Sequence, residues 1–314
     1  MFREQIKVVD CSIRDGGLIN DWQFSKDMVR EVFKALCAAH VDYMEIGYRA
    51  SPALIAKGNY GAWRFSTEDD IREVAEECAT KLSIMVDIGR VAEKDILPKE
   101  QSVVSMVRVA TYVKDIDKAI RLANHVEEKG YESTINIMAI SKAVSFDLDE
   151  ALAQIEKECK TKIVYIVDSN GALYSEQIDF FAKKFQRLMP TKIIGIHAHN
   201  NQQLGFANTI QAIISNCNMV DGTLFGIGRG AGNCPLELIL GFLKNPKYDI
   251  RPVLDIIPEV ILPLQEKIEW GYIIPYAITG ILNEHPRSAI AMRKTERKDD
   301  YRKFYEDLLS GDIE

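Results

Sequence analysis

The segment KIIGIHAHNNQQLGFANT, residues 192–209, joins a short apolar run to a polar turn and then to the start of a stretch with helical spacing. A β-branched apolar run is typical of a buried strand, and apolar residues three and four apart are typical of an amphipathic helix. The segment therefore predicts one strand–helix unit. His197 and His199 end the strand, and because residues i and i+2 point to the same face, both imidazoles can reach one point.

The same unit recurs along the whole chain. Eight runs are predicted as strands: IKVVDCSIR (6–14), VDYMEIGYR (41–49), LSIMVDIG (82–89), VVSMVRVAT (103–111), STINIMAI (133–140), KIVYIVDS (162–169), KIIGIHAH (192–199) and MVDGTLFGIG (219–228). Helices are predicted near 26–40, 66–80, 115–129, 147–159, 175–189, 204–217 and 234–244. Apolar strands that alternate with amphipathic helices indicate a parallel sheet covered by helices. The helix signal is weakest after the third strand, in RVAEKDILPKE.

Eight such units before residue 245 fit an α/β fold of the (β/α)8 TIM barrel type better than an open doubly wound sheet. The first turn, RDGG, also lacks the G-x-G-x-x-G pattern of dinucleotide-binding folds. After residue 245 the strand pattern stops, and helical segments punctuated by prolines follow. We predict a catalytic barrel domain over 1–245 and a C-terminal helical extension over 246–314.

Composition narrows the class of partner. The 314 residues are 47% hydrophobic and 27% charged, with a net charge of −7. This is ordinary for a globular protein, and the negative charge disfavours nucleic acid or an anionic membrane as a partner. MFREQIKVVDC does not have the apolar core of a signal peptide, and no run approaches the roughly 20 apolar residues that span a bilayer. We expect a cytoplasmic protein with a small-molecule ligand.

The cysteines give no sign of a cross-linked scaffold. Six lie far apart, at 11, 37, 78, 159, 217 and 234, with no CxxC pair. This spacing argues against a disulfide framework and against a thiolate zinc site. Most are expected to fill the core, and a reactive cysteine is the alternative.

Polar side chains gather where the predicted strands end, which in α/β barrels is where active sites lie. In strand order they are Arg14 and Asp15, then Glu45, Gly47 and Tyr48, then Asp87, then Arg108 and Thr111, then Asp168, Ser169 and Asn170, then His197, His199 and Asn200, and last the loop GIGRGAGN. Taken alone, the two histidines fit a metal site and a structural pair, with one buried, hydrogen-bonded histidine and one exposed histidine, equally well. The polar side chains at the same end of the barrel favour the metal site.

Two histidines and a carboxylate form an open site for a divalent metal such as Mn²⁺, Mg²⁺, Co²⁺, Fe²⁺ or Zn²⁺. Asp15 is the preferred carboxylate, because only strand eight separates strands one and seven in a closed barrel. Asp168 is the reserve candidate. The same ligand set also occurs in iron oxygenases, but those use other folds.

Six motifs in order resemble the metal-dependent aldolases and acyl-condensing barrels known as the DRE-TIM metallolyases, the HMG-CoA lyase-like family. They are DCSIRDGG, EIGYR, VRVATYVKDID, VDSNGALY, GIHAHNNQQLGFANT and GIGRGAGNCPLELIL. The resemblance is strongest to the 4-hydroxy-2-oxovalerate aldolases of that family and covers the whole barrel. WGYIIPYAITGILNEHP also resembles their helical extension.

The resemblance implies roles for particular residues. Asp15, His197 and His199 would bind the metal, and Arg14 would steady the enolate oxygen. Asn233 matches an asparagine that approaches the metal in condensing members, and Tyr276 lies where the valerate aldolases place a tyrosine for proton transfer. From the strand pattern, Glu45 and Arg108 are expected on the rim as substrate-binding residues, with a barrel-lining ion pair as the alternative.

One departure concerns the general base. The valerate aldolases read R-D-G-S-H in the first loop, with the histidine as base, whereas this chain reads RDGGL and carries Leu18 there. Either another group takes the proton or the substrate differs. Asp21 could act as the base if burial raised its pKa, although a turn residue is its simpler role.

The sequence thus predicts a carbon–carbon lyase that uses a divalent metal, Mn²⁺ first, to make or break a bond next to a 2-oxo acid, with pyruvate-enolate chemistry. The first alternative is a synthase of the same family that condenses an acyl-CoA with a 2-oxo acid. The second is a non-catalytic barrel that binds a small acid or sugar. A homodimer and an aldehyde dehydrogenase partner are compatible with the resemblance, which establishes neither.

Overall fold

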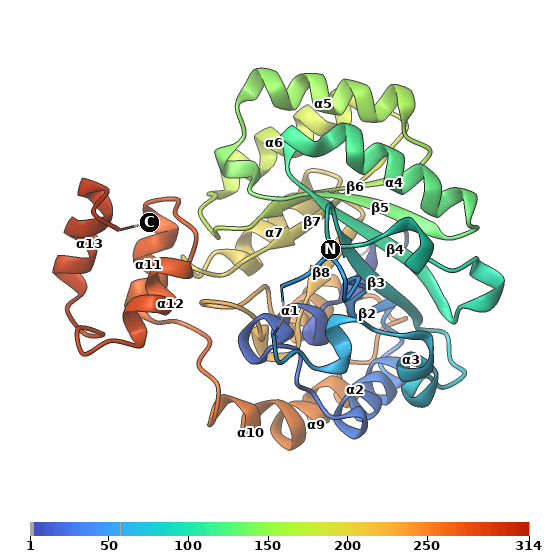
Figure 1. The fold of residues 1–314 in the computed structure, drawn as a ribbon, viewed down its shortest axis with the longest axis horizontal. Coiled ribbons are helices and arrows are strands. Elements are labelled where there is room, and N and C mark those ends of the chain that lie inside the picture. Colours follow the sequence, from blue (N-terminus) through green and yellow to red (C-terminus); the bar gives the residue numbers. More distant parts are fainter. Residues whose placement is uncertain (1–2, 57, 314) are drawn as a thin grey trace.

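The computed structural model describes residues 3–56 and 58–313, and its eight parallel strands close into a barrel in sequence order (Figure 1). The strands are β1 (Lys7–Asp10), β2 (Tyr43–Tyr48), β3 (Lys81–Asp87), β4 (Val104–Thr111), β5 (Glu132–Ile137), β6 (Ile163–Asp168), β7 (Ile193–Ala198) and β8 (Met219–Gly222). β1 pairs with β2 on one side and with β8 on the other, which closes the ring. The predicted TIM barrel is confirmed.

Helices cover the outside of the barrel (Figure 1). They are α2 (Lys26–Ala38), α3 (Glu68–Val74), α4 (Ile116–Glu128), α5 (Ser145–Glu158), α6 (Ser175–Leu188), α7 (Gly205–Ile214) and α8 (Leu236–Leu243). Helix α1 (Ser12–Asn20) instead lies at the open end of the barrel. Each of α2 to α8 either begins and ends within about two residues of its predicted segment or lies inside that segment. Between β3 and β4 the described residues form only short 3₁₀ turns, at Glu93–Asp95 and Lys99–Gln101, where the helix signal was weakest.

The prediction that strand one runs to residue 14 is wrong. β1 ends at Asp10, whose carboxylate accepts hydrogen bonds from the backbone N–H and the hydroxyl of Ser12 and so turns the chain. α1 begins at Ser12, and the negative charge of Asp15 in its first turn favours the helix N-terminus. Arg14 and Asp15 therefore lie on a helix rather than on a strand.

The core has two layers. The larger layer lies between the strands and the outer helices, and a smaller cluster fills the barrel interior with Val9, Cys11, Tyr43, Met106, Ile163, Tyr165, Val167 and Met219. Gly195 in β7 makes room for this cluster, because a Cβ there would lie 2.7 Å from the Tyr165 ring. The barrel is a packed core that leaves one end for polar groups.

The C-terminal segment is helical, as predicted, with α9 (Arg251–Ile256), a π-helical turn (Ile257–Ile261), α10 (Leu262–Gln265), α11 (Ile274–Ile281), α12 (Arg287–Arg293) and α13 (Tyr301–Ser310). α9 packs against α2, while α11, α12 and α13 form a group at one side of the barrel (Figure 1). Ala231, in the loop after β8, belongs to the apolar cluster of that group. No helix in the described ranges is long and apolar enough to cross a membrane. The domain boundary at 245 stays a prediction.

One cysteine pair corrects the sequence analysis. Cys37 at the end of α2 and Cys78 after α3 form a disulfide. The two residues are 41 positions apart, and only the packing of α2 against α3 brings them together. The four other cysteines are free and buried, as expected.

Candidate metal centre and substrate pocket

The first turn of α1 holds Arg14 and Asp15 over the open end of the barrel. Trp22 fixes this turn, because its indole Nε1 donates a 2.9 Å hydrogen bond to the carbonyl of Arg14. The indole also packs on Gly17, where a Cβ would lie 2.0 Å from the ring. A glycine at 17 is therefore required by close packing, and this packing positions the two charged side chains.

Asp15, His197 and His199 meet at one point. Their donor atoms all lie within 4.8 Å of one another, and all three side chains are buried. Asp15 Oδ2 is 3.0 Å from Nε2 of His197. Even so, both oxygens of Asp15, Nε2 of His197 and Nδ1 of His199 make no hydrogen bond with the described residues. Unpartnered buried polar atoms are costly, and a divalent cation would satisfy all of them.

Asn233 lies beside this cluster. It pairs with His199 in an isolated antiparallel bridge, and its Nδ2 donates to the carbonyl of Ile227 at 2.9 Å. Its Oδ1 is buried and has no hydrogen bond within the described ranges. Asp168 is the reserve candidate for the carboxylate ligand. Both of its carboxylate oxygens accept hydrogen bonds, from the backbone N–H groups of Ala172 and Leu173. Asn233 therefore offers a free oxygen donor, and Asp168 does not.

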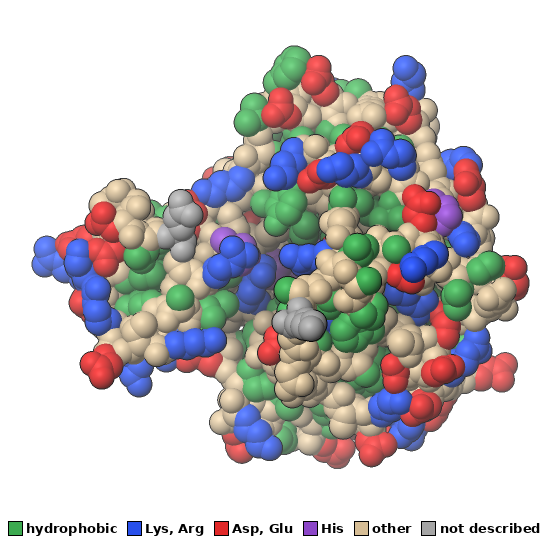
Figure 2. Space-filling view, viewed as in Figure 1, with side chains coloured by type: hydrophobic (Ala, Val, Ile, Leu, Met, Phe, Trp, Pro, Cys, Tyr) green, Lys and Arg blue, Asp and Glu red, His purple; other side chains and the backbone are tan. Residues whose placement is uncertain are grey.

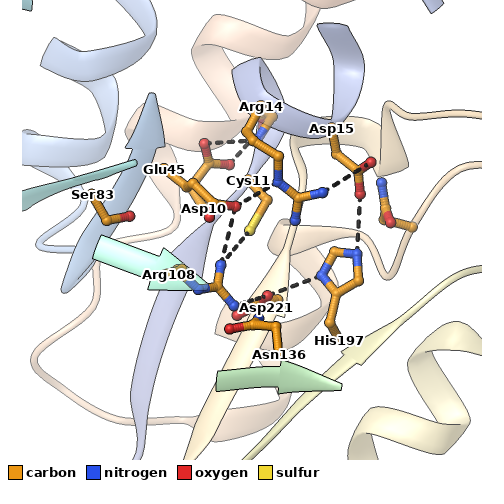
Figure 3. Close-up of polar contacts among 12 residues, drawn as sticks. Asp10, Cys11, Arg14, Asp15, Glu45, Ser83, Arg108, Asn136, His197 and Asp221 are labelled. Atoms are coloured by element: carbon orange, nitrogen blue, oxygen red, sulfur yellow. Dashed lines mark hydrogen bonds and ion pairs between the residues drawn. The ribbon is translucent and has the colours of Figure 1, made fainter. Parts of the chain in front are cut away.

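Six charged or ionisable side chains form a closed ring beneath the cluster (Figure 3). Arg14 Nε donates to Glu45 at 2.6 Å, and Glu45 lies 3.1 Å from Arg108. Arg108 Nη2 donates to Asp221 Oδ2 at 2.6 Å, and the same oxygen lies 2.9 Å from Nδ1 of His197. His197 contacts Asp15, which closes the ring at Arg14 with a distance of 3.2 Å. Each guanidinium therefore lies between two carboxylates, and the ring holds its members in fixed orientations.

Asp221 was missed by the sequence analysis. It lies within β8, inside the quoted run MVDGTLFGIG, and its side chain points into the barrel rather than to the rim. An acidic residue inside an otherwise apolar strand was the available signal, because a buried carboxylate requires a partner. The partners themselves, on β4 and β7, are visible only in the folded barrel.

The ring sets the charge states of the donors. Burial raises the pKa of Asp15, but Arg14 and His197 outweigh it, so the net pKa lies well below the usual range. For Asp221 burial is likewise outweighed, by Arg108 and His197, and the pKa falls to about 2. Burial lowers the pKa of His199 to about 3. At neutral pH the cluster thus combines an ionised carboxylate with a neutral imidazole, which suits a metal cation.

A pocket of about 350 Å³ opens above these residues. Arg14, Asp15, Leu18, His197 and His199 line it. This volume lies within the roughly 300–1,000 Å³ of typical small-molecule sites. The metal donors and Leu18 therefore face the same space, as the sequence analysis expected.

Five predicted residues do not line this pocket, and Asn233 beside the cluster is one of them. Glu45 and Arg108 are fully buried in the ring below it and not on the rim, because each precedes its strand end by three residues. Asp21 is an exposed residue at the C-terminal end of α1. Tyr276 is buried in α11, and its hydroxyl donates to Glu269 at 3.0 Å. The structure therefore brings neither Asp21 nor Tyr276 to the metal cluster.

Comparison with known proteins places the chain in a family. The HMGL-like family model matches residues 5–257. The chain belongs to the HMGL-like family. A relative from Rhodococcus erythropolis named 4-hydroxy-2-oxovalerate aldolase 1 is 30% identical over 265 residues, 82% of this chain and 76% of that protein. Another from Geobacillus thermodenitrificans, named 4-hydroxy-2-oxovalerate aldolase, is 28% identical over 87% of this chain and 81% of that protein.

Solved structures agree with this family. The N-terminal domain of a Bacteroides vulgatus protein, assigned as an aldolase, superposes with a TM-score of 0.81 and 29% identity over 95% of this chain and 100% of that chain. The HMG-CoA lyase of Brucella melitensis, at 12% identity and a TM-score of 0.68, shares the fold over 84% of this chain and 100% of that chain. The family that the motifs predicted is confirmed, and the similar curated relatives are named aldolases.

Proposed function

We propose that this HMGL-like protein is a divalent-metal-dependent aldolase that cleaves or forms the carbon–carbon bond next to a 2-oxo acid. One observation carries the proposal: the buried donor atoms of Asp15, His197 and His199 converge at a pocket beside the guanidinium of Arg14, which lies 3.2 Å from Asp15. The aldolase names of the relatives support the same class of reaction.

Asp15, His197 and His199 would hold the metal, with Asn233 Oδ1 as a fourth contact. A mixed set of nitrogen and oxygen donors suits Mn²⁺, our first choice, and also accepts Mg²⁺, Co²⁺ or Zn²⁺. The bound ion would act as a Lewis acid toward the ketone of the 2-oxo acid.

The protein's own residues orient the substrate and hold the protons. Arg14 is fixed by Glu45 and Asp15, so its positive charge stays beside the metal donors, where it would stabilise an enolate oxygen. Asp221 Oδ2 accepts a hydrogen bond from the Nδ1–H of His197, so Nε2 is the ring nitrogen that would bind the metal. The ring thus serves to preorganise the site.

The general base differs from that of the valerate aldolases. Leu18 lines the pocket and cannot accept a proton. Asp21 and Tyr276 lie outside the pocket, so we assign the role to neither. A water molecule in the pocket would take the hydroxyl proton in cleavage, while the released enolate carbon takes a proton from solvent.

A coupled assay tests this function. Purified protein with Mn²⁺ is given a series of 4-hydroxy-2-oxo acids, and pyruvate is measured with lactate dehydrogenase and NADH, with and without chelator. Chelator-sensitive pyruvate release supports the aldolase. Thiol release from acetyl-CoA with a 2-oxo acid would instead establish the condensing synthase. A barrel that binds acids yet gives neither product would be non-catalytic.

A cytoplasmic location, a homodimer and an aldehyde dehydrogenase partner stay predictions. They belong with this proposal because a 2-oxo acid aldolase would draw on cytoplasmic metabolites and release a reactive aldehyde. Sedimentation of the purified protein would test the dimer.

A further inference from the structure

Three side chains at the mouth of the pocket have no part in the reaction proposed above. Arg229 belongs to the loop after β8, His285 to the segment that joins α11 to α12, and Arg287 is the first residue of α12. All three line the same pocket as Asp15 and His199. Figure 2 shows basic and histidine side chains gathered at a hollow between the barrel and the C-terminal helices.

The three groups act on one another. Burial, then the charges of Arg229 and Arg287, lower the pKa of His285 to about 4, so its imidazole is neutral. Its Nδ1 accepts a 3.1 Å hydrogen bond from the backbone N–H of Arg287, so the hydrogen of the neutral ring is on Nε2. His285 is therefore a hydrogen-bond donor between two guanidinium groups. Such a set of donors suits an anion.

These arginines have no counter-ion. Within residues 3–56 and 58–313, neither Arg229 nor Arg287 forms an ion pair, and Nε of Arg229 is buried without a hydrogen bond. Arg229 is half-buried and Arg287 is exposed. Four arginines in the described ranges are buried: Arg64 lies over the Trp22 and Tyr48 rings, and the other three pair with carboxylates. Arg49 pairs with Glu68, Arg14 with Glu45, and Arg108 with Asp221.

Burial lowers the pKa of Arg229, and Asp15 is the first opposing charge. In the proposed function Asp15 is committed to the metal, so Arg229 would lose that compensation. A half-buried guanidinium without an anion is costly, and a bound anion would remove the cost.

The segment that carries His285 and Arg287 is tied to the barrel. The carbonyl of Asn283 accepts from Nδ2 of Asn170 at 3.0 Å, and its side chain accepts from Ser141 at 2.7 Å. Glu284 pairs with Lys142 at 2.7 Å. The two pocket residues are therefore held over the loops that follow β5 and β6.

The loop of Arg229 is equally fixed. Gly232 has φ of +80°, and a Cβ there would lie 1.9 Å from the carbonyl oxygen of Gly226. The backbone N–H of Ala231 donates to Asn201 Oδ1 at 3.1 Å. Arg229 thus projects from a preformed turn, which lowers the entropic cost of binding.

We propose that Arg229, His285 and Arg287 form an anion subsite, and that the aldehyde half of the substrate carries a carboxylate or a phosphate ester. This inference rests on the proposed aldolase function. The 2-oxo acid end would bind at Asp15, His197 and His199, and the second anion would bind at the mouth of the same pocket. The subsite and Leu18, which stands where the valerate aldolases carry a histidine, both indicate a substrate unlike 4-hydroxy-2-oxovalerate, whose C4 carries a methyl group and a hydroxyl but no anion.

The test uses condensation of pyruvate with matched aldehydes. Pyruvate loses a C3 proton to water to form the enolate, whose C3 bonds to the aldehyde carbon. The carbonyl π bond breaks, and its oxygen takes a proton back from water to become the 4-hydroxyl. Succinic semialdehyde is compared with butanal for the carboxylate, and glyceraldehyde 3-phosphate with glyceraldehyde for the phosphate. We expect kcat/KM at least about tenfold higher for one anionic member, and the preferred pair identifies the anion.

Variants then locate the effect. Arg229→Gln and Arg287→Gln should remove the preference through KM while sparing the neutral aldehyde, and Arg229→Lys should restore part of it. Arg302→Gln, an exposed arginine on α13, is the control and should change nothing. Equal rates for both members of each pair, or an equal loss on both in Arg229→Gln, would overturn the subsite and leave the aldolase intact.

A binding measurement separates this failure from failure of the function. Titration calorimetry of metal-free protein with succinate and with inorganic phosphate should show binding that Arg229→Gln and Arg287→Gln each weaken at least about tenfold. Binding of this kind without any aldol product would refute the aldolase and keep the subsite. If neither anion binds and no pair is discriminated, the subsite does not exist.

Discussion

Nδ1 of His197 lies 2.9 Å from Oδ2 of Asp221, an oxygen that also accepts a hydrogen bond from Arg108. The first contact fixes the tautomer of the imidazole, because a proton on Nδ1 leaves Nε2 free to bind a cation. The second keeps the carboxylate ionised and oriented. Asp221 would therefore be a positioning residue for the proposed metal centre, although it does not line the pocket.

Loss of this positioning should weaken metal binding. Asp221→Asn should lower the affinity for Mn²⁺ about 10–100-fold, the usual scale for an outer partner of a metal ligand. Titration calorimetry measures the change, and Asp117→Asn on the exposed face of α4 is the control. Wild-type affinity in a folded Asp221→Asn protein would show that His197 needs no such support.

The metal centre itself predicts a stoichiometry. Purified protein should bind about one divalent ion per chain, and His199→Ala should abolish this binding because it removes a neutral donor from the cluster of three. Elemental analysis after gel filtration measures the content. Full occupancy in a His197→Ala, His199→Ala double variant would refute the assignment of the ligands.

Arg14 should matter for turnover rather than for metal content. Arg14→Ala should retain the ion and lower kcat by roughly a hundredfold or more, the scale for loss of one oxyanion donor. Because Glu45 and Asp15 lose a partner, thermal unfolding of the variant must be measured as well. Arg14→Lys keeps the charge and separates the two effects. Unchanged kcat in a folded Arg14→Ala protein would make Arg14 purely structural.

Leu18 tests whether the pocket lacks a base or serves another substrate. Leu18→His places an imidazole in the pocket, where a general base typically contributes about 10²–10⁴-fold. We expect no gain, or a loss, on the native substrate, since the anion subsite indicates a reshaped pocket. Steady-state rates on 4-hydroxy-2-oxovalerate and on anionic substrates decide this. The wild-type protein could instead turn over 4-hydroxy-2-oxovalerate as fast as enzymes that have the histidine. This result would contradict both the missing base and the change of substrate.

Gly17 should be sensitive to a single methyl group. Gly17→Ala places a Cβ 2.0 Å from the Trp22 ring and should lower the free energy of unfolding by about 1–3 kcal/mol, as overpacking does. Gly16→Ala is the matched control, because its Cβ would lie 3.2 Å from the nearest atom, the tip of Ile227. Urea unfolding followed by tryptophan fluorescence compares them. Equal stabilities would mean that Trp22 moves freely.

Local pattern was sufficient for the architecture and for the clustering of Asp15, His197 and His199. Alternating apolar strands and amphipathic helices depend on backbone periods of 2.0 and 3.6 residues, which are legible in any one segment. The same-face rule placed His197 beside His199, and barrel closure placed Asp15 near them. These inferences needed only neighbouring residues and the order of strands.

Packing between distant segments decided the rest. Asp10 bonds with Ser12, so α1 begins where the apolar pattern still predicted strand. Asp221 contacts His197 only because β7 and β8 are neighbouring strands. The hydroxyl of Tyr276 donates to Glu269, a contact that depends on the position of α11 in the fold.

The anion subsite depends on the same kind of contact. Arg229 and His285 are 56 residues apart and lie together only because the C-terminal helices are tied to the loops of the barrel. Such contacts depend on the free energy of the whole fold, and no local period in the sequence encodes them.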